Sequence, residues 1–172
     1  MDINIITEDD ITANRCTQFI KNISKGKCCY KSPEIRKSIR DYNGTPSNYS
    51  EMIEYFIKHA QRHEDDYRVF VTDVFYMYYH ALTALLFSQN ISWYGETSMI
   101  AECENLLMNE KVFSKIGISR EEFNDLMQHV RLFFKEKNRA YLEPGSLDAE
   151  TLIHYFNEDI GRVRKIFMST YT

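Results

Sequence analysis

The stretch 67–88, which reads YRVFVTDVFYMYYHALTALLFS, decides the fold of this chain. Wound as a helix, it carries apolar side chains on nearly every side, which a helix tolerates only when other helices surround it. Thr72, Asp73, His80 and Thr83 interrupt the apolar run, so the stretch is typical of a buried core helix rather than a membrane span. It therefore predicts the central helix of a single all-α domain.

The segments on either side of this stretch repeat apolar residues at steps of three and four, the spacing of one helix face. We predict further helices over 10–23, 32–43, 49–61, 97–108, 119–137 and 147–168. Ser119 and Glu122 form a capping box at one of the starts, and 45–48 (Thr-Pro-Ser-Asn) is predicted as a loop. The pattern predicts an antiparallel up-and-down bundle of four to five core helices with an N-terminal helical extension.

Composition favours one domain, because 172 residues can bury one sizeable core but not two. The acidic start, MDINIITEDDI, lacks the positive and apolar regions of a secretory signal, so we expect a cytoplasmic protein without a membrane segment. Cys16, Cys28, Cys29 and Cys103 show no C-x-x-C spacing, which indicates reduced thiols rather than a zinc ribbon or a disulfide scaffold.

Positive charge is concentrated near the start of the chain. Residues 15–40 hold eight Lys or Arg against Glu34 alone, a local charge of +7, so the remainder carries −11 within a total of −4. Such a segment is a candidate for binding nucleic-acid phosphates, although it could equally dock on an acidic face of this protein or of a partner. The candidate nucleic-acid-binding residues are Lys21, Lys25, Lys27, Lys31, Arg36, Lys37 and Arg40.

Two histidines have the spacing of metal ligands. His59 and His63 lie four residues apart, so both imidazoles would project from one face of a helix. A third ligand is not evident, and surface pairs of this kind arise often by chance. We therefore expect no metal site.

The two polar groups of the central stretch need partners if they are buried. We expect His80, which lies among tyrosines, to bond to backbone or to a tyrosine hydroxyl. We expect Asp73 to pair with Arg68 or with a lysine of another helix. A functional role for His80 is the alternative.

Common catalytic and nucleotide-binding motifs are not found in the sequence. It contains no Gly-rich phosphate loop, no G-x-S-x-G and no H-E-x-x-H. The usual hydrolase and nucleoside-triphosphatase classes are thereby disfavoured, and no cofactor is expected.

The stretch 75–86, FYMYYHALTALL, resembles the second-helix signature of HEPN domains, commonly YYAMFHAAKALL. Three further segments fall where that family has corresponding features: 88–91 at the end of this helix, 97–101 at the next helix start, and 138–141 near the turn before the last helix. The resemblance covers residues 49 to 168. It implies a HEPN-like bundle over 49–172, with 1–48 packed on it as an extension.

The resemblance also implies partners and an activity. HEPN domains are often homodimers and are frequently paired with a small nucleotidyltransferase in toxin–antitoxin systems. Their active members are metal-independent ribonucleases in which four to six residues separate an Arg from the His that follows it, and none of the five histidines here has an arginine at that spacing. We therefore predict a non-catalytic module that binds nucleotide, RNA or protein.

Two alternatives stay open. The first is an atypical metal-independent ribonuclease, for which His80, Arg131 and Lys137 are weak catalytic candidates. The second is a viral Bcl-2-like interaction bundle, whose Asn-Trp-Gly-Arg motif is faintly echoed by 92–95, SWYG. The aromatic surplus further predicts a homodimer with its seam on the helix from Phe123 to Phe134.

Overall fold

The computed structural model describes residues 46–89, 91, 93, 95–113, 115–140 and 148–170, and every regular element in these ranges is a helix. The helices are α3 (Pro46–Arg62), α4 (Tyr67–Ser88), α5 (Glu96–Leu106), α6 (Glu110–Phe113), α7 (Arg120–Arg139) and α8 (Ala149–Ser169). The predicted all-α bundle is confirmed. The predicted N-terminal extension lies outside the described residues.

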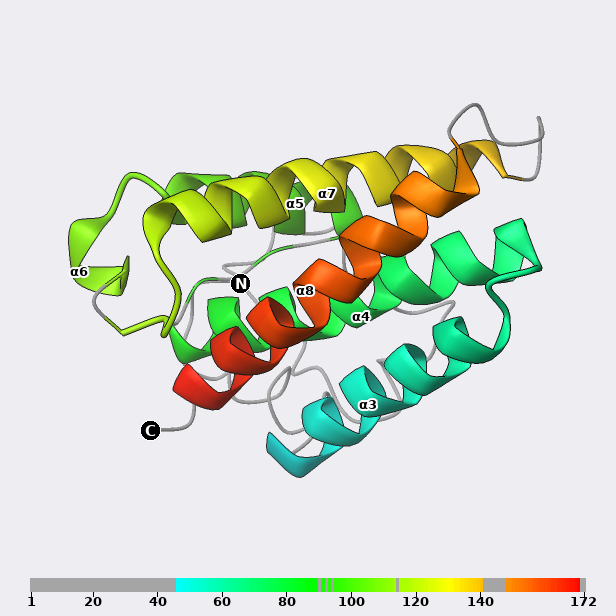
Figure 1. Cartoon of the computed structure of the whole chain (residues 1–172). Helices are drawn as coiled ribbons and strands as arrows, with labels where there is room; N and C mark the ends of the chain where they lie inside the picture. The colour runs from blue at the N-terminus through cyan, green and yellow to red at the C-terminus, as the bar shows by residue number, and fades with distance from the viewer. Residues whose placement is uncertain are drawn as a thin grey trace, which may run out of the picture.

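Helix α4 is the centre of the bundle, as its sequence predicts. It packs against α3, α5, α7 and α8 (Figure 1), and side chains from Phe70 to Leu86 are buried along its length. By length and composition alone α4 is apolar enough to span a membrane, but 72% of its most apolar window is buried inside the bundle. Burial against other helices accounts for its composition.

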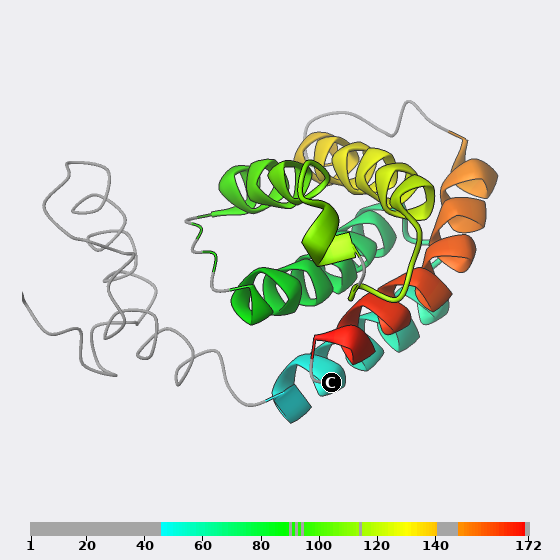
Figure 2. The same cartoon turned by 90° about the vertical axis from the view of Figure 1, so that its left-hand side faces the viewer.

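Two helix pairs flank α4 (Figure 2). In one pair, Arg164 of α8 donates two hydrogen bonds of 2.7 Å to Glu54 of α3. In the other pair, α7 runs antiparallel to α5, since Lys137 contacts Glu96 at the start of α5 and Arg131 contacts Glu104 near its end. Ion pairs thus join the outer helices over an apolar core.

The turn between α3 and α4 is short and tightly bonded. The Asp66 carboxylate caps α4 by accepting hydrogen bonds from the backbone N–H groups of Arg68 and Val69. The backbone N–H of Asp66 in turn donates to the carbonyl of His63. This tight hairpin sets the end of α3 beside the first turns of α4.

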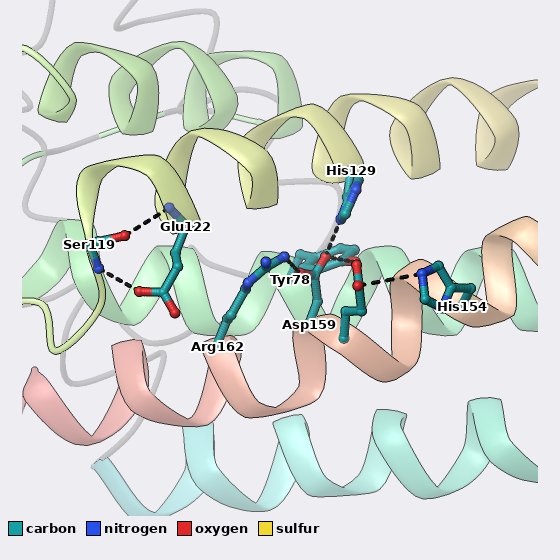
Figure 3. Close-up of polar contacts among 8 residues, drawn as sticks. Tyr78, Ser119, Glu122, His129, His154, Asp159 and Arg162 are labelled. Carbon is teal, nitrogen blue, oxygen red and sulfur yellow. Dashed lines mark hydrogen bonds and ion pairs between the residues drawn. The ribbon is translucent and has the colours of Figure 1, made fainter.

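Helix α7 begins as predicted. The Ser119 hydroxyl accepts from the Glu122 N–H at 3.1 Å, and the Glu122 carboxylate accepts from the Ser119 N–H at 2.7 Å (Figure 3). The apolar stripe of α7, however, is core and not surface. Its buried members are Phe123, Leu126, Met127, Val130 and Phe133. The predicted dimer seam on this stripe is therefore wrong, because α4 and α8 already cover it.

Three local expectations are corrected. Pro46 to Asn48 are helical rather than a loop, since α3 begins at Pro46 and the first turn of a helix does not need the missing N–H of proline. The apolar repeat of the helix predicted over 49–61 includes Met52, which we expect on the buried face, but Met52 is 38% exposed. A third difference is the short helix α6, Glu110–Phe113, which the sequence pattern does not predict because four residues are too few to show a helical period.

Candidate functional site

His80 lies between α4 and α3, stacked on an aromatic ring. Its imidazole and the Phe56 ring are 14° from parallel with centroids 5.5 Å apart, and Tyr49 and Tyr79 flank it. Within the described chain the contacts of this imidazole are ring contacts, in place of the hydrogen bond expected from the sequence. Burial lowers the pKa of His80 to about 4, so the ring is neutral near pH 7.

Lys137 and Arg131 both face carboxylates of α5. The Nζ atom of Lys137 lies 2.5 and 2.6 Å from the two carboxylate oxygens of Glu96, and 4.3 Å from the centroid of the Phe75 ring. The Lys137 ammonium thus combines an ion pair with a cation–π contact in a nearly buried position. The more exposed Arg131 donates from Nε to Glu104.

The structure does not bring the three weak catalytic candidates together. His80 packs toward α3, whereas Arg131 and Lys137 hold α7 against α5. Each side chain already has a partner from its own bundle.

A buried polar centre that the sequence reasoning missed lies where α4, α7 and α8 meet (Figure 3). Asp159 is fully buried, and Tyr78 donates a 2.7 Å hydrogen bond to its Oδ2. His129 Nδ1 lies 2.7 Å from the same oxygen, and Arg162 donates to Oδ1 at 2.7 Å. Burial and the Asp159 charge raise the pKa of Tyr78 well above its ordinary value.

This centre is suited to structure rather than to chemistry. Three donors satisfy one carboxylate, which offsets the cost of burying its charge. The only sequence signal was Asp159 itself, a charged residue three positions after Phe156 and four before Val163 on the apolar face of α8.

A second buried carboxylate joins the start of α4 to the end of α7. The Tyr67 hydroxyl donates a 2.5 Å hydrogen bond to Oε2 of Glu136, which is fully buried. Burial and this carboxylate raise the pKa of Tyr67 far above its ordinary range. The phenol is therefore a fixed donor.

The histidine pair of α3 meets a third group across the hairpin. His59 Nδ1 lies 2.6 Å from Oδ2 of Asp73 on α4, and His63 Nδ1 lies 2.8 Å from the backbone carbonyl of His59. The two imidazole centroids are 4.1 Å apart. Asp73 thus pairs with His59 and not with Arg68 or a lysine, because the tight turn sets the end of α3 beside it.

The three residues form a polar cluster at a partly exposed edge. One ligand-capable atom from each of His59, His63 and Asp73 lies within 4.8 Å of the other two. The side chain of His59 is 31% exposed, whereas that of Asp73 is 9% exposed. The fold therefore brings a carboxylate to the histidine pair that the sequence did not reveal.

The candidate nucleic-acid-binding residues from Lys21 to Arg40 lie outside the described part of the chain. Comparison with protein-family models, with curated protein sequences and with solved structures gives no match for this chain.

Proposed function

We propose that this chain is a HEPN-like helical module that binds RNA without cleaving it. The observation that carries the proposal is that each of the three weak catalytic candidates is engaged by side chains of this same chain. Lys137 and Arg131 are paired with Glu96 and Glu104, and His80 is stacked on Phe56.

These contacts disfavour the atypical ribonuclease. RNA cleavage requires a proton donor or acceptor and usually a cation at the developing phosphate charge. Lys137, whose charge is neutralised by Glu96, is poorly placed to stabilise the developing phosphate charge. His80, a neutral imidazole packed between aromatic rings, is poorly placed to donate or accept a proton.

RNA is the proposed ligand because the charge of residues 15–40 suits phosphate. A local charge of +7 releases condensed counterions when it meets a nucleic-acid backbone, which favours binding at low salt. The acidic remainder of the chain opposes that attraction, so we expect micromolar affinity at best.

The test measures binding and cleavage on one labelled single-stranded RNA. We expect RNA retention in filter binding at low salt and intact RNA on a gel after prolonged incubation. His80→Phe and Lys137→Met should change neither result. If the wild type cleaves the RNA and either variant does not, the protein is a ribonuclease and not a binding module. If the wild type does not retain RNA at low salt, RNA is not its ligand.

We further propose that the module acts as a homodimer and pairs with a nucleotidyltransferase-type protein. The resemblance to HEPN domains supports both partners. Because the α7 stripe is core, the dimer contact must use other side chains. The exposed large apolar residues of the described chain are Met52, Tyr55, Met108 and Met168.

A further inference from the structure

We propose that His59 and His63 form a binding site for a divalent transition-metal cation of the Zn²⁺ class, with Asp73 as a positioning residue. The site lies on the α3–α4 hairpin and is independent of the proposed RNA binding. The Nε2 atoms of both imidazoles are the donors.

The hydrogen bonds of the two rings fix where their lone pairs lie. A carbonyl oxygen can only accept, so His63 Nδ1, 2.8 Å from the His59 carbonyl, must carry a hydrogen. The Asp73 carboxylate likewise accepts from His59 Nδ1 at 2.6 Å. A ring with its hydrogen on Nδ1 holds its lone pair on Nε2 once it is neutral, so Nε2 is the atom that each histidine offers to a metal.

This hydrogen-bonding arrangement is typical of metal-bound histidine. A ligating imidazole usually donates its other N–H to a carboxylate or a backbone carbonyl, which fixes the ring and makes the ligand more basic. His59 shows the first arrangement and His63 the second. Histidines near the end of a helix often bond its last carbonyls, so the contact of His59 with Asp73 is the more specific of the two signals.

The two imidazole rings lie close enough to each other to share one ion. The rings project from one face of α3 with centroids 4.1 Å apart and planes 36° apart. One ligand-capable atom from each of His59, His63 and Asp73 lies within 4.8 Å of the other two, and binding requires the two Nε2 atoms to come within about 4.2 Å, the largest separation of two nitrogens on one Zn²⁺. His63 lies at the partly exposed edge, where its ring has room to turn toward His59, and Tyr55, stacked 20° from parallel at 5.4 Å, holds the His59 ring.

Charge also favours a cation here. Asp73 is a nearly buried carboxylate whose partner in the described chain is His59, and its negative charge lies on the Nδ1 side of the ring whose Nε2 would bind the metal. A metal bound to the far nitrogen of His59 would offset it through the ring.

The donor type decides the class of metal. Imidazole nitrogen suits Zn²⁺, Ni²⁺ and Cu²⁺, whereas Mg²⁺ and Ca²⁺ prefer oxygen. Two protein nitrogens leave coordination positions for water, so the site is open and exchangeable rather than a closed structural site.

Calorimetric titration of the whole chain with Zn²⁺ tests the site, after treatment with N-ethylmaleimide so that thiols do not compete. We expect one Zn²⁺ per chain, no binding of Mg²⁺, and at least a tenfold loss of affinity in His59→Ala and in His63→Ala. His154→Ala is the matched control, because His154 is an exposed helical histidine with Glu158 one turn later, 3.4 Å away. Its affinity should equal that of the wild type.

Asp73 variants separate positioning from ligation. Asp73→Asn keeps an oxygen that accepts from His59, so Zn²⁺ affinity should fall only slightly. Asp73→Ala should lose on the order of 10–100-fold, as for other groups that orient a ligand. Equal, large losses in both variants would overturn the positioning role.

Nitrogen-15 spectra of wild-type imidazoles provide a test that needs no variant. Zn²⁺ should shift the Nε2 signals of His59 and His63 and leave their Nδ1 signals bonded to hydrogen. The proposal is overturned if no histidine signal responds, if Nδ1 responds instead, or if the double variant His59→Ala, His63→Ala binds Zn²⁺ like the wild type.

Discussion

The hydroxyl of Tyr78 donates a 2.7 Å hydrogen bond to the carboxylate of Asp159, 81 residues further along the chain, and both side chains are fully buried. The bond joins the central helix α4 to α8. His129 and Arg162 also bond to the Asp159 carboxylate, so this one carboxylate joins helices α4, α7 and α8.

Removing that carboxylate should destabilise the bundle strongly. Asp159→Ala leaves the fully buried hydroxyl of Tyr78 and the partly buried His129 and Arg162 without their acceptor, which should cost about 3–5 kcal/mol of unfolding free energy. Tyr78→Phe removes one donor and should cost about 1–3 kcal/mol. Urea denaturation measures both, and Glu158→Ala on the neighbouring exposed position should lie within about 0.5 kcal/mol of the wild type. An Asp159→Ala variant as stable as that control would contradict the role of the centre.

His80 should make the protein less stable in acid. Its pKa is about 4 in the folded chain against an ordinary value of 6.5, so below pH 6.5 the unfolded chain takes up the proton first. The free energy of unfolding keeps its full value, as far as His80 is concerned, above pH 6.5. It falls by up to about 3 kcal/mol as the pH drops from 6.5 toward 4. Urea denaturation between pH 7 and pH 4 measures it.

His80→Phe is the informative variant for this loss, because it keeps a ring against Phe56 and removes the titrating group. Its stability should fall less steeply with acid than that of the wild type. His154→Ala, at an exposed position, should follow the wild type throughout. Parallel curves for all three proteins would show that His80 does not contribute.

The sequence predicted the helices better than the polar sites, for a physical reason. Burial of α4 on all sides follows from its own composition, and the start of α7 follows from Ser119 and Glu122, because both signals are local. The contact of His59 with Asp73 depends on how tightly the hairpin turns. The contact of Tyr78 with Asp159 depends on how α8 returns across the bundle, which no local pattern encodes.

Leu85 tests the central position of α4. The residue is fully buried, so Leu85→Ala removes core contacts and leaves a cavity, at a cost of about 2–5 kcal/mol. Met108 is 85% exposed, and Met108→Ala should cost less than about 0.5 kcal/mol. Chemical denaturation compares the two variants. Similar costs at both positions would mean that α4 is not the core helix.

Sedimentation at micromolar concentration tests the proposed homodimer. We expect twice the 20.5 kDa mass of one chain. Because Phe123 is fully buried in the protomer, Phe123→Ala should lower the unfolding free energy without changing the sedimenting mass of the folded protein. A wild type that sediments at the mass of one chain would overturn the dimer.

The basic segment should make RNA binding depend steeply on salt. Replacing Lys21, Lys25 and Lys27 by glutamine should weaken binding and flatten the plot of log affinity against log salt by about 0.7–1 unit for each lost phosphate contact. Filter binding of a short single-stranded RNA across a salt series measures both effects.

The matched control changes the same charge elsewhere. Lys58, Lys115 and Lys165 are exposed on the described bundle, so glutamine at these three positions lowers the net charge equally. If RNA contacts the basic segment, this variant should keep the wild-type salt slope and lose only a little affinity through the weaker long-range field. Equal slopes in both triple variants would mean that RNA responds to total charge alone, and the segment would then not be the binding site.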